Sequence, residues 1–200
     1  VRRECAIFQV AVRAHKPVAA FLNSASPGVI AMFQPNAFYP SHRTYLEAVA
    51  EAMRVEYEAI VAAGFILQID SPDLGLGRHM MFKRLPEEEY LQRVNENVDA
   101  LNHALRNIPA NRVRMHVCWG NYEGPHTHDA PLATVLKVAL RAKPQGLLFE
   151  AANPRHAHEW EDLADLPIPE DKVLIPGVVD TTTNFVEHPR LIAQRIVNVA

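Results

Sequence analysis

Several features that mark particular classes of protein are scarce or missing in this chain of 200 residues. It holds two cysteines, Cys5 and Cys118, too far apart in sequence to build a disulfide framework, so a reducing, cytoplasmic setting is expected. No apolar run approaches the roughly 18 residues that span a bilayer, and no signal peptide opens the chain. The net charge is −3 without any lysine or arginine block, which argues against nucleic-acid and membrane partners.

Glycine-rich phosphate loops are missing as well. Neither G-x-G-x-x-G nor G-x-x-x-x-G-K-[ST] occurs, which excludes the common nucleotide-binding fingerprints. The stretch "LGLGRH" at 74–79 is interpreted as a loop on which no helix opens, and it carries little weight. Because no internal repeat, low-complexity tract or linker is present, a single domain is expected.

What the chain does contain is an alternation of short apolar runs and helical patterns. Strands are predicted at 17–24, 64–70, 112–118, 146–152 and 172–180. These runs are continuous, as expected for parallel strands covered on both faces. Helices are predicted at 41–64, 86–107, 129–143 and 154–166, the first with Ser41 as its cap. Repeated strand–helix units predict an α/β fold with a parallel sheet.

Each predicted strand ends in polar side chains, namely Asn23 and Ser24, Asp70, His116 and Cys118, Glu150, and Asp180. In a (β/α)₈ barrel the catalytic residues come from the carboxyl ends of several strands, so this pattern predicts a (β/α)₈ TIM barrel. Such a barrel needs eight strands and about 250 residues. The chain also starts without methionine and ends in the open helical pattern "HPRLIAQRIVNVA". Residues 1–200 are therefore expected to be one barrel domain, truncated at both ends.

The spacing of His116 and Cys118 predicts a metal site. Residues two apart on a strand point to the same face, so both side chains can reach one ion. Imidazole and thiolate are ligands typical of zinc, and Glu150, at the end of the next strand, can add an oxygen. Three such ligands leave one position for substrate. The alternatives remain a core histidine and a buried cysteine that packs like an apolar residue.

Other histidines are rival candidates. His126 and His128 lie in a Gly/Pro-rich loop after the metal strand and could line the pocket, whereas His156 and His158 are expected to be solvated, because residues two apart diverge on a helix. Asp70 is either a turn cap or a carboxylate that binds a cationic or hydroxyl group of a substrate.

The segment that follows the metal strand is expected to line the substrate pocket. It contributes Trp119, Asn121 and Tyr122 as predicted substrate-binding residues, beside Asn23, Ser24, Asp70, His126 and Asp180. Ser24 has no evident His–Asp partner, so a serine nucleophile is not expected. Cys5 is expected in the core, and Asp73 in a loop.

Four segments, taken in order, resemble the C-terminal catalytic barrel of cobalamin-independent methionine synthase: the strand at 67–70, "MHVCWGNY" (115–122), "LLFEAAN" (147–153) and "VLIPGVVDTTT" (173–183). The resemblance spans roughly residues 17–200. It implies that His116, Cys118 and Glu150 bind zinc, with a second cysteine that would lie after Asp180 and beyond Ala200. It also implies that Asp70 recognises the substrate amine and belongs to the catalytic set.

The reaction implied is zinc-dependent transfer of a methyl or other alkyl group to a small-molecule thiol such as homocysteine. Zinc deprotonates a bound thiol, which keeps it nucleophilic. One departure is the run Thr181–Thr183, where the family has a histidine soon after the aspartate.

"HVCWGNYEGPHTHD" looks more like the short single-barrel branch, which includes the epoxyalkane:coenzyme M transferases. Opening of an epoxide by a zinc-bound thiol is therefore the first alternative. A metal hydrolase that uses His126, His128 and Asp70 is another, and a barrel relative that binds a ligand without catalysis is the third. The oligomeric state stays open, a homo-oligomer included.

Overall fold

The structure is a computed structural model that describes residues 1–121 and 124–200. Five parallel strands form one sheet in the order β1-β2-β3-β4-β5, with bounds Phe21–Ala25, Ile66–Asp70, Val113–Val117, Gly146–Glu150 and Val173–Gly177. Each strand is added beside the previous one without a reversal of order. That is the topology of a (β/α)₈ barrel, whereas the order of a doubly wound sheet reverses. The predicted fold class is confirmed.

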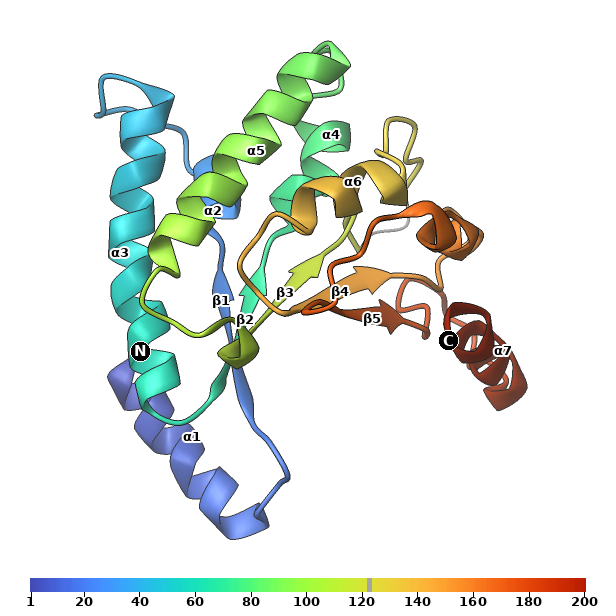
Figure 1. The fold of residues 1–200 in the computed structure, drawn as a ribbon, viewed down its shortest axis with the longest axis horizontal. Helices are drawn as coiled ribbons and strands as arrows, with labels where there is room; N and C mark the ends of the chain where they lie inside the picture. The colour runs from blue at the N-terminus through green and yellow to red at the C-terminus, as the bar shows by residue number, and fades with distance from the viewer. Residues whose placement is uncertain (122–123) are drawn as a thin grey trace.

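Helices α3, α5 and α6 lie along one face of this sheet (Figure 1). The α-helices are α1 (Arg2–His15), α2 (Pro27–Phe33), α3 (His42–Ala62), α4 (Leu76–Met80), α5 (Glu87–Ala104), α6 (Leu132–Ala139) and α7 (Pro189–Val199). Short 3₁₀ segments are η1 (Pro72–Leu74), η2 (Ala110–Arg112) and η3 (Glu159–Asp165). The hydroxyl of Ser41 accepts a hydrogen bond from the Thr44 N–H, which caps α3 as predicted.

Two local predictions were wrong. The stretch 74–79 is not a plain loop, because η1 and α4 cover it and pack on the end of β3. The helix expected at 154–166 is instead the 3₁₀ segment η3. Leu166 ends it in an extended conformation, in keeping with the restriction that Pro167 places on the preceding residue.

Along β2 and β3, buried residues alternate with partly accessible ones, so the two faces of these strands differ in burial. The face toward the helices is buried and consists of Leu67, Ile69, Met115, Val117, Leu147 and Phe149. The opposite face, here called the inner face, carries Gln68, Asp70, Arg114, His116, Leu148 and Glu150, which are partly accessible. The core therefore lies between the sheet and its helices, and the inner face is the less buried of the two.

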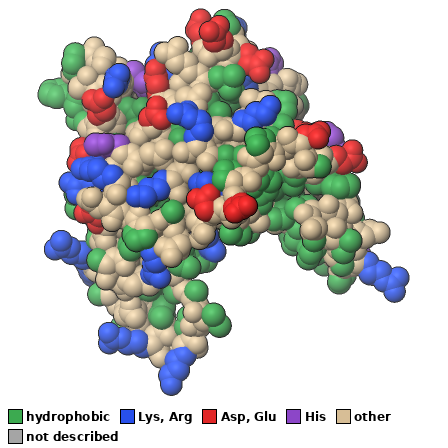
Figure 2. Space-filling model, viewed as in Figure 1, with side chains coloured by type: hydrophobic (Ala, Val, Ile, Leu, Met, Phe, Trp, Pro, Cys, Tyr) green, Lys and Arg blue, Asp and Glu red, His purple; other side chains and the backbone are tan. Residues whose placement is uncertain are grey.

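Exposed apolar side chains occur toward both ends of the chain, and those near the C-terminus include Val173, Phe185, Val186, Ile196 and Val197. Figure 2 shows hydrophobic side chains over the right-hand part of the molecule, where Figure 1 places β5 and α7. β1 and β5 are the edge strands of the sheet, and β5 is far less buried than β2, β3 or β4. Within the described residues, no helix is long and apolar enough to cross a membrane.

Candidate functional site

The carboxyl ends of β2, β3 and β4 bring together the predicted metal and catalytic residues. Register pairs Asp70 with His116, and Val117 with Phe149, so Glu150 follows beside Cys118 on the adjoining strand. Neighbouring strands are about 4.8 Å apart, so these residues stand on adjoining strand ends. Among the described residues, however, the group whose ligand atoms all lie within 4.8 Å of one another is a different one, so a shared ion would require the strand-end side chains to turn toward each other. The Nδ1 atom of His116 lies 2.8 Å from Oδ1 of Asp70. This strand-end group consists of Asp70, His116, Cys118 and Glu150.

Backbone hydrogen bonds from the loops hold these strand ends in place. The N–H groups of Ser26, Ser71 and Leu76 donate to the carbonyl oxygens of Asp70, His116 and Cys118, each reaching across to the next strand. The loop that follows one strand therefore fixes the end of its neighbour.

Gly75 permits the closest of these approaches. A Cβ atom at this position would lie 2.6 Å from the Cys118 carbonyl oxygen, closer than a real Cβ contact allows. Only glycine lets the start of α4 pack against the backbone of Cys118 without a shift. The glycine-rich stretch to which sequence reasoning gave little weight therefore positions the cysteine.

Cys118 is a free, partly buried thiol in an acidic surrounding. Burial raises the pKa of Cys118 to about 11, and the charges of Asp70, Glu150 and Asp73 act in the same direction. The thiol is therefore protonated at neutral pH. A cation bound here would reverse this balance, because it would offset the carboxylates and favour the thiolate. The nitrogen, sulfur and oxygen donors fit the ligand chemistry of zinc.

The strand-end side chains also have partners within the protein. Oε1 of Glu150 accepts hydrogen bonds from the N–H groups of Ala152 and Asn153. Asp70 holds Nδ1 of His116, so Nε2 is the His116 nitrogen left for a ligand. A carboxylate on the second ring nitrogen is the usual support of a metal-binding histidine. Asp70 therefore suits a positioning role, and zinc binding by this group stays a prediction.

A second set of such residues lies in the loop after Cys118 and beside it. Within the described part of the chain, His79, His126 and Asp129 have ligand atoms that all lie within 4.8 Å of one another. His126 Nδ1 is 2.9 Å from both carboxylate oxygens of Asp129, and the rings of His79 and His126 stack at 4.8 Å. His156 contacts Asp129 through Nε2 at 3.2 Å. These four residues are called the buried histidine cluster.

His156 was expected at the surface, and that prediction was wrong. Its exposed fraction is 4%, because its ring stacks on Trp119 at 4.1 Å while Nδ1 contacts Glu159 at 2.6 Å. The helical pattern on which the expectation relied is absent there, so the turn of chain directs His156 inward. His158 is exposed, as predicted.

Trp119 is almost completely buried rather than open to the inner face. Its indole N–H donates to the Ala130 carbonyl at 2.7 Å, which ties both ends of the loop together. A tryptophan held in this way is a structural anchor of the segment that follows Cys118. Its predicted contact with substrate remains a prediction.

The remaining predicted substrate residues do not lie together. Asn23 lies on the inner face, in register with Gln68, whereas Ser24 faces the helices and donates to Glu56 of α3. Asn121 accepts a hydrogen bond from Thr181. Tyr122 lies outside the described residues.

Asp180 borders a cavity of about 660 Å³ beyond β4 and β5. Its carboxylate accepts hydrogen bonds from the N–H and hydroxyl of Thr182, and Asn153 donates to that same hydroxyl. Burial acts to raise the pKa of Asp180, but these hydrogen bonds hold it below the usual value. The side chain is therefore ionised at the mouth of the sheet.

Asp70 does not meet the two histidines with which the metal-hydrolase alternative combines it. Asp70 pairs with His116 instead, and His126 pairs with Asp129. His128 is exposed, and its Nδ1 atom contacts the hydroxyl of Thr127. A hydrolytic site of that composition would need these side chains to move.

Comparison with solved structures supports the fold. A B12-independent methionine synthase from Shewanella sp. W3-18-1, solved in complex with selenomethionine, is similar to this chain with a TM-score of 0.68 and 17% identity. The match covers 90% of this chain and 50% of that one, so this chain spans half the length of that protein. No protein-family model matches, and no curated protein matches in sequence. At this identity the likeness shows the fold alone.

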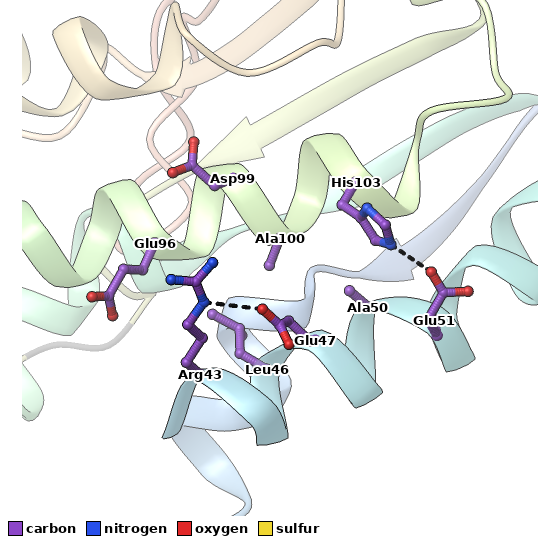
Figure 3. A pocket seen from close by; sticks show the side chains of 9 residues that line it. All are labelled: Arg43, Leu46, Glu47, Ala50, Glu51, Glu96, Asp99, Ala100 and His103. Carbon is purple, nitrogen blue, oxygen red and sulfur yellow. Dashed lines mark hydrogen bonds and ion pairs between the residues drawn. The ribbon is translucent and has the colours of Figure 1, made fainter. Parts of the chain in front are cut away.

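Another cavity, of about 550 Å³, lies between α3 and α5, away from the strand ends (Figure 3). Its charged residues are largely paired across it or along one helix, as in Arg43 with Glu47 and His103 with Glu51. Its floor is formed by the small or apolar side chains of Leu46, Ala50 and Ala100. No strand residue lines it, so it stands apart from the chemistry described above.

Proposed function

We propose that this chain carries a zinc-dependent site that transfers an alkyl group to a small-molecule thiol. The leading reaction is methionine-synthase-like transfer of a methyl group to a thiol such as homocysteine. The observation that carries the proposal is the position of His116, Cys118 and Glu150 at the ends of adjacent strands, with Asp70 hydrogen-bonded to the His116 ring. The likeness in fold to a methionine synthase supports it.

His116 Nε2, Cys118 Sγ and a Glu150 carboxylate oxygen would hold the ion. Zinc supplies a Lewis acid that keeps a substrate thiol deprotonated at neutral pH. Asp70 accepts the Nδ1–H of His116, which fixes the tautomer and leaves the Nε2 lone pair for coordination. The rigid strands keep the donors at one edge of the sheet.

In the reaction, the thiol of the substrate loses its proton and its sulfur attacks the carbon of the alkyl donor. A sulfur–carbon bond forms while the bond between that carbon and its leaving atom breaks, and the leaving atom takes up a proton. The accessible side of Asp70 faces the same edge and can bind an ammonium group of the thiol substrate. Holding both reactants on the inner face lowers the entropic cost of their encounter.

Opening of an epoxide by the thiol is the second candidate, favoured by the residues after Asp180. Thr182 occupies the carboxylate of Asp180 with its hydroxyl and its N–H. The next histidine, His188, accepts the Arg190 N–H as the cap of α7. No described imidazole therefore stands beside Asp180 to protonate a departing amine, whereas epoxide opening expels no separate leaving group, and the alkoxide that it forms is basic enough to take its proton from water.

The test is the zinc content of the protein, measured by elemental analysis for the wild type and for Cys118→Ala. Cys5→Ala is the matched control, because Cys5 is a buried free thiol on α1. We expect one zinc at the strand ends that is lost with Cys118→Ala and kept with Cys5→Ala. Zinc that is unchanged by Cys118→Ala would overturn the proposal.

The reaction itself is tested by incubation of the zinc-loaded protein with a thiol and either a methyl donor or an epoxide. Product is measured by mass spectrometry. Thioether formed from the methyl donor alone supports the leading reaction, and thioether formed from the epoxide alone supports the second. Activity that survives Cys118→Ala would contradict both.

A further inference from the structure

We infer that His79, His126 and Asp129 form a second divalent-metal site, independent of the strand-end group, for a borderline transition metal such as Zn²⁺. His79 lies in α4 after β2, while His126 and Asp129 lie in the loop between β3 and α6. Their ligand atoms already lie within 4.8 Å of one another. Two imidazoles and a carboxylate are a common three-ligand set of zinc sites that keep one position open.

The hydrogen bond between His126 and Asp129 joins two groups that also serve as metal ligands in proteins. The Nδ1 atom is 2.9 Å from Oδ1 and from Oδ2 of Asp129, and the His126 side chain is fully buried. A divalent ion bound by both residues would take the place of this hydrogen bond between the imidazole and the carboxylate.

The Asp129 carboxylate is supported from its other side. Arg155 donates to Oδ2 at 3.3 Å and His156 lies 3.2 Å from the same oxygen, while His156 is itself held by Glu159. Ligating carboxylates in metal sites are normally hydrogen-bonded in this way. The support orients the carboxylate and leaves Oδ1 toward His126.

An entry path leads to the site. A cavity of about 290 Å³ is lined by Arg78, Tyr90, His128 and Asp129, among others, so it reaches one of the three ligands from solvent. The ion and a water molecule could enter through it. The same cavity exposes His128, which gives a control residue in the same loop.

Metal at this position would join α4 to the loop that begins at Cys118. That loop is anchored by the indole of Trp119 on the carbonyl of Ala130, the residue after Asp129. The bound metal would thus stabilise the loop that follows Cys118 by linking it to α4. It does not rest on the proposed function, because it shares no ligand with that group.

The experiment uses Cys118→Ser as the background, which removes the strand-end thiolate. Zn²⁺ is titrated into this variant and bound metal is measured, with Co²⁺ as the spectroscopic probe. We expect one equivalent per chain, and cobalt ligand-field bands without the thiolate-to-cobalt charge-transfer band. Adding His79→Asn to the background should weaken binding at least about tenfold, whereas adding His128→Asn should leave it unchanged.

His79 is chosen because it is less buried than His126, and circular dichroism checks that each variant is folded. Asp129→Asn serves as a second ligand variant, with the same expected loss. Absence of stoichiometric metal in Cys118→Ser would overturn the inference, and so would equal losses from His79→Asn and His128→Asn. If instead wild type binds no more metal than Cys118→Ser, the strand-end proposal fails while this one stands.

Discussion

The strand-end group and the buried histidine cluster both contain histidine and aspartate, but these side chains differ in exposure. The side chains of Asp70 and His116 are 49% and 36% exposed, and they stand on the ends of β2 and β3. In the cluster, the side chains of His126 and His156 are 0% and 4% exposed, and they come from irregular segments. Fewer than ten residues separate Cys118 from His126 in sequence, yet the two groups are held by different means.

The difference in exposure separates side chains that can bind a ligand from side chains that hold one another in place. A side chain on a rigid strand end keeps its position with few contacts, so its donor atoms remain accessible to substrate and metal. Side chains from loops keep their positions only through contacts with one another, and any ligand must displace some of these. We therefore expect changes in the cluster to affect stability first, and changes at the strand ends to affect binding first.

The largest effect is expected from Trp119→Ala, which removes the anchor of the cluster. Loss of a buried aromatic side chain and of its packing on His156 should lower the free energy of unfolding by about 3–5 kcal/mol. Urea denaturation measures the loss. Trp160→Ala is the control, because Trp160 is only partly buried, and it should cost clearly less. Equal losses would contradict the anchoring role of Trp119.

Asp70 and Asp73 lie close in sequence but differ in burial, so the dependence of stability on pH should distinguish them. Burial raises the pKa of Asp73 to about 6, although hydrogen bonds from Ser26 and Asn97 oppose the shift. Between about pH 4 and pH 6 the folded state then holds a proton that the unfolded state has lost. Stability should therefore fall as pH rises through this window, by on the order of 2–3 kcal/mol, and stay level above it.

Asp73→Asn should remove this fall, whereas Asp70→Asn at the accessible position should keep it. The measurement is the free energy of unfolding at several pH values for wild type and for both variants. A profile for Asp73→Asn that parallels wild type between pH 4 and pH 6 would show that Asp73 does not titrate there.

Gly75→Ala tests the contact between α4 and the strand ends. The new Cβ would clash with the Cys118 carbonyl oxygen, so we expect a loss of about 1–3 kcal/mol in stability and weaker zinc binding by Cys118. Gly77→Ala is the matched control in the same stretch, because its nearest neighbour, the Phe82 ring, is 3.4 Å away. Thermal melts and zinc titration of both variants decide whether the clash matters.

The smallest effect is expected from Asp70→Asn, which keeps the shape of the side chain but removes its charge. The amide oxygen can still accept the His116 N–H, so zinc affinity at the strand ends should fall only about tenfold, with little change in stability. Asn23→Ala, on the same inner face, should leave zinc affinity unchanged. A loss as severe as that of Cys118→Ala would indicate that Asp70 is itself a ligand.

The strand positions and the polar residues at their ends could be predicted from the sequence. Strands expected at 64–70 and 112–118 are observed at Ile66–Asp70 and Val113–Val117. Apolar runs and their boundaries are local signals, because each depends on which side chains follow one another along the chain. The same holds for the Ser41 cap, and Cys5 lies in the core as expected.

The contacts that give these residues their roles depend on the tertiary structure. Asp70 meets His116 across 46 positions, and Gly75 meets Cys118 only because the segment after β2 crosses the end of β3. His156 was expected in solvent and is buried under Trp119. The hydrophobic periodicity of the sequence does not predict such contacts, because they form only when distant segments pack side by side. The sequence alone determined a parallel α/β barrel-type fold with polar strand ends, while only the packing of distant segments decided which side chains are open to ligand and which hold one another.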